Sequence, residues 1–365
     1  TCALPICEMT KTHYIVPFFI PHIGCPHDCV FCSQRKITGK ERPVSPEEVI
    51  PTIREYRTTI PRKARVVEAA FFGGSFTGIP VPLQRAFLKE AYLAKKEGLI
   101  DRIRLSTRPD YIDQEVLERL VQFHVDTIEL GVQSMSDEVL SKSARGHNCT
   151  DVVQASRKIR EYGFRLGLQM MVGLPGSRPD IEVQTASRIC ALKPDFVRIY
   201  PTLVIRGTVL EKMYKKGMYK PPSLEEAVDL CAVLAAMFIR ENVAIIRIGL
   251  QPTELISEGG EVVAGPFHPS FRQLVDSRLV LRAVKWILDQ RGIEPEKELV
   301  MEVNPRSLST FKGIGKESIK VLEREYPGLK IKVLKNQSLG YSEIRFTNGK
   351  RVFEADYRQV IKSIK

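Results

Sequence analysis

Gly24-Cys25-Pro26-His27-Asp28-Cys29-Val30-Phe31-Cys32 is the stretch around which this 365-residue sequence is organised. Its cysteines Cys25, Cys29 and Cys32 follow a Cys-x3-Cys-x2-Cys pattern. A loop this short can turn all three sulfur atoms toward one point. Thiolates grouped in this way bind soft metals, so the stretch predicts either a zinc site or an iron–sulfur cluster.

Zinc and an iron–sulfur cluster place different demands on the rest of the chain. A structural zinc site needs a fourth ligand, which usually comes with a second cysteine pair from a distant loop. The sequence has no second Cys-x-x-Cys pair, and His27 lies too close to its neighbours for all of them to take separate tetrahedral corners. A cubane 4Fe–4S cluster held by three cysteines instead keeps one iron open for another ligand.

The composition predicts a reduced, globular protein with a preference for anionic partners. Hydrophobic residues make up 43% of the chain, enough for a sizeable core, and no apolar run is long enough to cross a membrane. Eight cysteines, three crowded and the others scattered, form no disulfide framework, so we expect a cytoplasmic location. The net charge of +12 favours RNA or an anionic small molecule, although a basic surface can also serve solubility alone.

Strand and helix patterns alternate through the first 250 residues. Parallel strands with right-handed crossover helices follow from that alternation. About six such units predict an α/β fold, a partial (β/α)6 TIM-like barrel whose functional residues lie at the carboxyl ends of the strands. The expected strands are 14–20, 66–72, 102–107, 127–133, 165–173 and 196–204, with a possible further strand at 244–248.

The pattern changes after Gln251. We expect a helix over 271–291, strands at 299–303 and 329–334, a helix over 316–325, and a hairpin in which 342–346 pairs with 351–353. These elements predict a smaller α+β region at 256–365, after a barrel domain at 1–255. Lys312-Gly-Ile-Gly-Lys316 has the pattern of a helix-hairpin-helix turn that contacts nucleic-acid phosphate, but a simple turn before a helix is the favoured explanation.

The cysteine spacing, followed by Gly73-Gly74-Ser75 at a strand end, resembles the radical S-adenosylmethionine (SAM) enzymes. The resemblance implies a 4Fe–4S cluster on Cys25, Cys29 and Cys32, with SAM bound at the open iron. It also implies reductive cleavage of SAM to a 5′-deoxyadenosyl radical that abstracts hydrogen from a substrate. The electron would come from a donor such as flavodoxin or ferredoxin.

Five further motifs, between His13 and Gln251, resemble the radical SAM half of the Elongator catalytic subunit and its bacterial relatives. Two departures stand out, since that subunit has a longer gap between its first two cysteines and continues into an acetyltransferase domain. The residues after Gln251 do not resemble such a domain, so acetyl-CoA chemistry is not implied. The motifs are Phe72–Thr77, Ser106–Asp110, Glu129–Ser134, Arg145–His147 and Tyr200–Thr208.

The same resemblance assigns roles to individual residues. Phe31 and the backbone around Met171 would contact adenine, and Gly73, Gly74 and Ser75 would bind the amino group of SAM. The coproporphyrinogen dehydrogenase branch implies that Arg145 pairs with the SAM carboxylate. There, Gln133 would contact the ribose or carboxylate, and Gln169 takes the place of an acidic ribose contact. Residues expected toward the substrate are Thr107 (also a cofactor contact), Arg108, Tyr200 and Arg206.

Three functions remain open at this point. The Elongator-like motifs and the basic charge favour an RNA substrate, in particular a tRNA base. A small molecule or tetrapyrrole, as in the coproporphyrinogen dehydrogenase branch, is the alternative within the enzyme class. A non-catalytic RNA-binding protein with structural zinc is the alternative outside it. Salt-dependent binding would indicate RNA, and a colourless protein that leaves SAM intact would indicate zinc.

Overall fold

The computed structural model describes residues 12–20, 25, 29–33, 44–61, 64–250, 256–257, 260–293 and 298–363. His27 and the amino-terminal cysteines Cys2 and Cys7 lie outside the described residues. The described residues form two compact units. One comprises those within Met9–Ser223 and Leu250–Pro269, and the other those within Leu224–Gly249 and Ser270–Lys365. A domain boundary at residue 255 stays a prediction.

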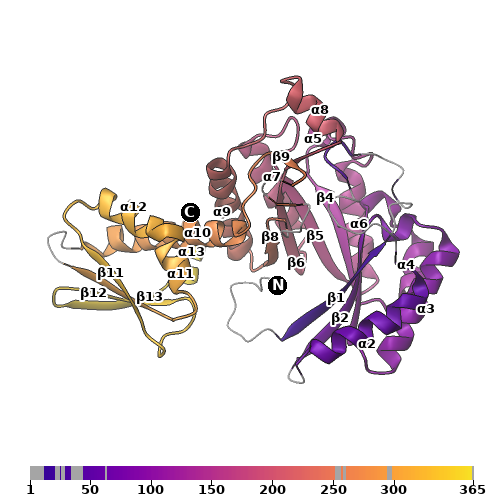
Figure 1. Ribbon diagram of the computed structural model, residues 1–365, viewed down its shortest axis with the longest axis horizontal. Helices are drawn as coiled ribbons and strands as arrows, with labels where there is room; N and C mark the ends of the chain where they lie inside the picture. Colours follow the sequence, from indigo (N-terminus) through magenta and orange to yellow (C-terminus); the bar gives the residue numbers. More distant parts are fainter. Residues whose placement is uncertain are drawn as a thin grey trace. The chain divides into compact units, whose positions relative to one another are not determined.

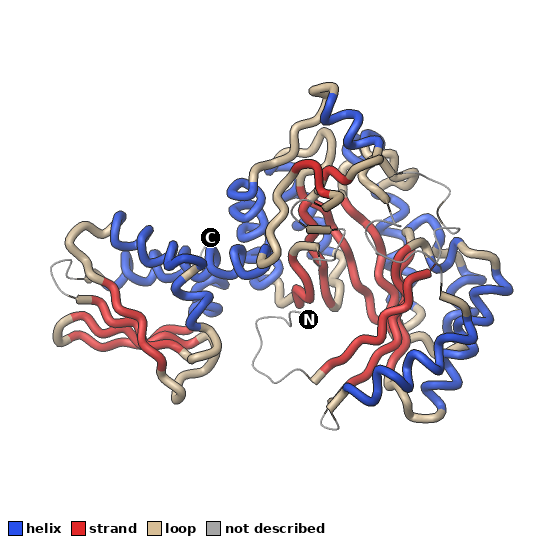
Figure 2. The backbone as a smooth tube through the Cα atoms, in the orientation of Figure 1, coloured by secondary structure: helices blue, strands red, loops and turns tan. Residues whose placement is uncertain are grey.

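The first unit contains six parallel strands that neighbour one another in the order of the sequence. Figures 1 and 2 show these strands as a curled sheet with helices along its outer side. This arrangement confirms the predicted partial (β/α)6 barrel. The strands are β1 (His13–Ile20), β2 (Val66–Gly73), β3 (Arg102–Thr107), β4 (Thr127–Gln133), β5 (Arg165–Val172) and β6 (Phe196–Pro201).

Local signals fix where the covering helices begin. Ser45 and Glu48 form a capping box at the 3-10 turn Pro46–Glu48 that leads into the first of them, in which the backbone N–H of Ser45 donates to Glu48 Oε2 at 2.8 Å. The side chains of Asp113 and Asn148 accept backbone hydrogen bonds at the starts of α4 and α6. The helices are α2 (Val49–Thr59), α3 (Val81–Lys96), α4 (Gln114–Gln122), α6 (Cys149–Glu161) and α7 (Pro179–Ala191).

Short elements that the sequence analysis did not predict extend the carboxyl edge of this sheet. β6 ends at Pro201, earlier than expected. The chain then forms β7 (Val204–Ile205), which pairs antiparallel with β9 (Val262–Ala264), and α8 (Val209–Lys215). A further short helix, α5 (Asp137–Lys142), follows β4. These segments are too short for a clear hydrophobic period, which explains why they were missed.

Successive side chains of a strand point to opposite faces, and this alternation separates an apolar layer from a charged one. Ile103 and Leu105 of β3 are fully buried among apolar neighbours, whereas Arg104 between them takes part in a buried charge network. Arg104 Nη2 lies 2.8 Å from Glu68 Oε2 on β2, and its Nη1 lies 3.6 Å from Glu129 Oε2 on β4. The interior of the sheet therefore carries paired charges.

The second unit is an α+β assembly, as the sequence predicted. Its four-stranded sheet has the order β11-β10-β12-β13, and the predicted hairpin is confirmed as the antiparallel pair β12–β13. The strands of this sheet are β10 (Leu299–Val303), β11 (Ile331–Lys335), β12 (Glu343–Asn348) and β13 (Arg351–Asp356). The possible further strand at 244–248 is confirmed as β8 (Ala244–Ile248), which lies outside this four-stranded sheet. The helices are α9 (Leu224–Arg240), α10 (Phe271–Arg291), α11 (Leu308–Lys312), α12 (Glu317–Glu325) and α13 (Tyr357–Ser363).

We predict that Arg104→Met lowers the free energy of unfolding by about 3–5 kcal/mol, because it leaves the carboxylates of Glu68 and Glu129 buried without this cation. Urea denaturation measures the change. The control is Arg54→Met on α2, whose exposed pair with Glu97 contributes less than about 1 kcal/mol. Equal effects of the two substitutions would contradict the assigned role of Arg104.

Candidate functional site

The cysteine loop is held by backbone hydrogen bonds to two neighbouring segments. The N–H of Val30 donates to Ser143 O, at the end of α5, at 3.2 Å. The carbonyl of Val30 accepts from the N–H of Leu210, in α8, at 2.7 Å. Figure 1 shows α5 and α8 at the same end of this unit. The two bonds position Cys29, the residue that precedes Val30, between the segments that follow β4 and β6.

Arg145 connects the cysteine loop to the end of β4. Its Nη1 donates to Cys29 Sγ at 3.3 Å, and its Nη2 donates to the carbonyl oxygen of Gly131 at 2.6 Å. Both Arg145 and Cys29 are buried. Arg145 therefore joins Cys29 directly to the carboxyl end of β4.

The end of β4 is shaped to admit the guanidinium of Arg145. A Cβ atom on Gly131 would lie 3.1 Å from Arg145 Nη2 and 3.0 Å from Gln133 Nε2, so a side chain here would crowd both. The register with β5 shifts between Gly131 and Gln133, and Gln133 has a φ of 67°, in the left-handed region. The carboxyl end of β4 is thus irregular where the sequence predicted a cofactor contact.

The ends of β2 and β3 meet beside Cys25. The hydroxyl of Thr107 lies 2.8 Å from Ser75 Oγ and 2.5 Å from Thr77 Oγ1, and the N–H of Arg108 donates to Ser75 Oγ at 3.1 Å. Burial raises the pKa of the Cys25 thiol, while the backbone of Ser75 and the charge of Arg108 act in the opposite direction. Thr107 therefore fixes the Gly73-Gly74-Ser75 turn, and its predicted contact with cofactor stays a prediction.

Gln169 and Tyr200 belong to the charged interior of the sheet. Gln169 Nε2 donates to Glu129 Oε1 at 2.6 Å, and Arg198 Nε lies 2.6 Å from the same oxygen. Arg198 Nη1 also donates to Tyr200 Oη at 3.1 Å. The amide of Gln169 is thus engaged by a carboxylate. The sequence analysis did not assign Glu129 or Arg198 to the site. Each is a charged residue in the middle of an apolar strand, and this pattern could have indicated them.

The remaining predicted residues are Met171, Phe31 and Arg206. Met171 is half-buried near the end of β5, where Gly173 N–H donates to Glu182 Oε1 and Gly173 O accepts from Tyr219. Phe31 packs against the apolar cluster of Val30, Val204, Leu210 and Tyr219. Arg206 is exposed and lies 3.8 Å from Glu261, so no described contact joins it to the cysteines.

The residues around the cysteine loop fit a charged, polar cofactor. Within the described part of the chain, three buried polar atoms here have no hydrogen-bond partner, namely Gln133 Oε1, Arg145 Nε and Arg108 Nη1. Buried groups of this kind normally have partners, so they suit a ligand with a carboxylate and an amine. No three Cys, His, Asp or Glu side chains of the described residues form a ready-made metal site. Iron–sulfur ligation by Cys25, Cys29 and Cys32 therefore rests on the chemistry of this donor set.

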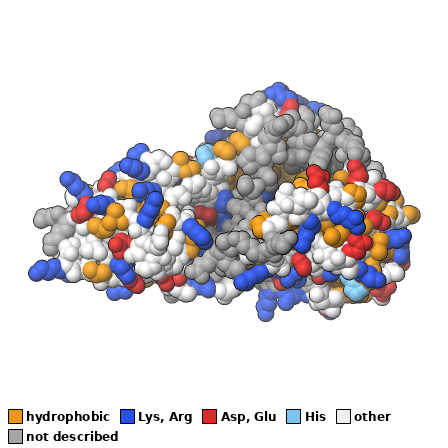
Figure 3. Space-filling model, turned by 60° about the horizontal axis from the view of Figure 1, so that its bottom comes forward, with side chains coloured by type: hydrophobic (Ala, Val, Ile, Leu, Met, Phe, Trp, Pro, Cys, Tyr) orange, Lys and Arg blue, Asp and Glu red, His pale blue; other side chains and the backbone are white. Residues whose placement is uncertain are grey.

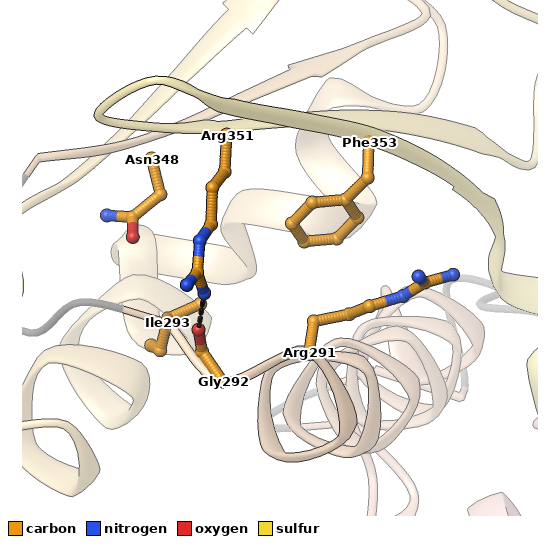
Figure 4. Close-up of a pocket in the computed structure, with 6 residues that line it drawn as sticks. All are labelled: Arg291, Gly292, Ile293, Asn348, Arg351 and Phe353. Carbon is orange, nitrogen blue, oxygen red and sulfur yellow. Dashed lines mark hydrogen bonds between the residues drawn. The ribbon is translucent and has the colours of Figure 1, made fainter.

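A separate pocket of about 250 Å³ lies in the α+β unit and contains none of the predicted site residues (Figure 4). Arg351 Nη1 donates to the carbonyl oxygen of Gly292 at 2.7 Å, and the guanidinium of Arg291 lies 5.5 Å from the centre of the Phe353 ring. These contacts attach β13 to the end of α10. The pocket is therefore explained as part of the junction between β13 and α10.

The chain matches two family models. The model described as the Radical SAM superfamily covers residues 19–186, and the Radical_SAM C-terminal domain covers residues 194–280. None of the helices in the described residues has the length and apolar character needed to span a membrane.

Curated relatives and a solved structure agree with these matches. A tRNA uridine(34) acetyltransferase of Dehalococcoides mccartyi is 27% identical over 75% of this chain and 64% of its own length. Elongator complex protein 3 of Homo sapiens is 29% identical over 58% of this chain and 42% of its own length, so this chain spans only part of both relatives. The archaeal Methanocaldococcus infernus Elp3 structure, lacking residues 1–46, superposes with a TM-score of 0.60 at 21% identity. It covers 80% of this chain and 71% of its own, and supports the fold.

His147 provides a pH test of the site. Burial and the charge of Arg145 lower the pKa of His147 from 6.5 to about 4, and its Nε2 lies 3.2 Å from Val132 O. Because the unfolded chain binds this proton more tightly, we predict that folding stability falls as the pH drops from 6.5 toward 4, by at most about 1.4 kcal/mol per pH unit. His147→Gln should remove this contribution, as measured by urea denaturation across that range. The same pH dependence of the free energy of unfolding in the wild type and in His147→Gln would contradict this prediction.

Proposed function

We propose that this chain, a radical SAM superfamily enzyme, cleaves SAM at a 4Fe–4S cluster and acts on RNA, in particular on a base of tRNA. The observation that carries the first part is the bridge that Arg145 makes between Cys29 and the end of β4. It joins one predicted cluster ligand to the strand end where Gln133 presents a buried oxygen without a partner among the described residues. A ligand that contacts both Arg145 and Gln133 would therefore lie beside the cluster.

Cys25, Cys29 and Cys32 would hold the cluster, and the side chains around them would hold SAM. When bound and reduced, such a cluster supplies the electron that cleaves SAM to methionine and a 5′-deoxyadenosyl radical, which takes a hydrogen atom from the substrate. Arg145 and Arg108 supply positive charge for the SAM carboxylate, and the turn after β2 leaves its backbone open to the amino group.

Two observations support RNA as the substrate. The net charge of +12 is the sign that a polyanionic partner requires. The relatives include proteins named for tRNA uridine(34) acetylation. On the face shown in Figure 3, Lys and Arg side chains are scattered among acidic and apolar ones. The proposal therefore rests on the overall charge and the relatives, and not on a basic patch on this face.

We predict that protein purified without oxygen is brown, contains iron and forms 5′-deoxyadenosine from SAM with dithionite. Cys29→Ala should lose both the iron and this activity, because the cluster loses a ligand that Arg145 also contacts. The matched control is Cys190→Ala in α7, outside the cysteine loop, which should keep both. Iron analysis and quantification of 5′-deoxyadenosine measure the outcome.

The substrate is tested in the same reaction. Adding tRNA that lacks base modifications should increase the yield of 5′-deoxyadenosine and leave a changed nucleoside in the tRNA digest. Binding of that tRNA should weaken steeply as salt rises. A colourless protein that leaves SAM intact after cluster reconstitution would contradict the enzymatic proposal. SAM cleavage without any effect of RNA would contradict only the RNA substrate and favour a small molecule.

A further inference from the structure

The segment from Arg206 to Lys220, which contains α8, is strongly basic. It holds five cations (Arg206, Lys212, Lys215, Lys216 and Lys220) and one acid, Glu211, and all five cations are exposed. The acid is buried and engaged, since Glu211 Oε1 lies 2.8 Å from Lys215 Nζ and its Oε2 accepts from Gly207 N–H at 2.7 Å. The exposed face of this segment therefore presents positive charge without an exposed acid of its own.

Apolar side chains lie among these cations. Val209 is 46% exposed, Tyr214 38% and Met218 69%. They are not needed for packing, because the inner side of the helix is already supplied by Leu210 and Met213, which pack in the cluster of Val30, Val204 and Tyr219. Val209 lies on the same side of α8 as Lys212 and Lys216, so exposed apolar and basic side chains share one face. Protein interfaces commonly combine apolar and polar side chains in this way.

This surface is attached directly to the cysteine loop. The N–H of Leu210 donates to Val30 O at 2.7 Å, and Val30 is bonded to Cys29 in the chain. An α-helix with its side chains is only about 10–12 Å across, so a protein seated on the outer face of α8 lies about one helix diameter from that loop. Electron transfer falls steeply with distance, which makes this proximity useful to an electron donor.

We propose that the α8 surface, defined as Arg206, Val209, Lys212, Lys216 and Met218, docks a small acidic electron-transfer protein that reduces the cluster. The inference rests on the proposed function, since it needs a cluster to reduce. For each SAM cleaved, one electron leaves the reduced donor and one C5′–S bond breaks. The products are methionine and, after hydrogen transfer, 5′-deoxyadenosine. Charge complementarity and the exposed apolar side chains favour a folded acidic partner over RNA.

The test compares two reductants on the full-length protein with its cluster. Lys212→Glu/Lys216→Glu reverses two charges on the α8 surface. The control is Lys89→Glu/Lys96→Glu, which reverses two exposed charges on α3. With reduced flavodoxin at low salt, we expect the first variant to form 5′-deoxyadenosine about tenfold more slowly than the wild type and the control to be unchanged. With dithionite, which needs no docking surface, all three proteins should react equally.

The remaining outcomes separate this inference from the proposed function. Equal flavodoxin-driven rates in the wild type and both variants would overturn the docking surface, and so would equal losses in the two variants. In either case, SAM cleavage with dithionite would still support the proposed enzymatic function. A variant that keeps its flavodoxin rate but loses tRNA binding would overturn it in favour of RNA on α8. Absence of SAM cleavage with dithionite in the wild type would overturn both proposals. Met218→Ser should slow the flavodoxin reaction alone, which tests the apolar part of the surface.

Discussion

The hydrogen bonds of Arg145 are the constraint on which the site depends. One guanidinium spans the sulfur of Cys29 and a backbone carbonyl of β4, so Cys29 is attached to the sheet. A side chain at Gly131 would crowd this bridge. The bridge also requires the turn that precedes Arg145, where Ala144 has a positive φ of 51° and Gly146 follows with 73°. Local backbone strain of this kind is commonly retained at functional sites.

Side chains that alternate between the two faces of each strand produce both the apolar packing of the fold and the charged layer beneath the site. Apolar side chains on one face of each strand pack against the helices, and this burial stabilises the unit. The opposite face carries Glu68, Arg104, Glu129 and Arg198, whose charges compensate one another. Burial alone would raise the pKa of Glu68, but His13 and Arg104 hold it below its usual value. The interior therefore stays polar and paired, with the cysteine loop at the carboxyl edge.

The sequence predicted the features that repeat along the chain. The six strands, the covering helices and the β12–β13 hairpin follow from hydrophobic period and turn residues, which act locally. Ser75, Thr107 and Arg108 could be placed together because parallel strands end at one edge of a sheet. Their functional roles remain predictions, since those depend on a bound cofactor.

Other features depend on contacts that no local pattern reports. Gln169 was expected beside a ribose, but its amide is bound to Glu129, a neighbour forty residues earlier in the sequence. The hydrogen bond between α8 and the cysteine loop joins segments about 180 residues apart, and α8 has too few turns to give a strong helical signal. Arg206 follows β7, whose pairing with β9 was not predicted, and its expected place at the substrate stays a prediction.

The central claim is that the three cysteines hold a cluster whose open iron binds SAM beside Arg145. Electron paramagnetic resonance of the dithionite-reduced protein, recorded with and without SAM, tests it most directly. The account predicts a signal of a reduced 4Fe–4S cluster whose g values shift when SAM is added, because the open iron gains a ligand. A cluster signal that SAM leaves unchanged, or the absence of any iron–sulfur signal, would contradict it.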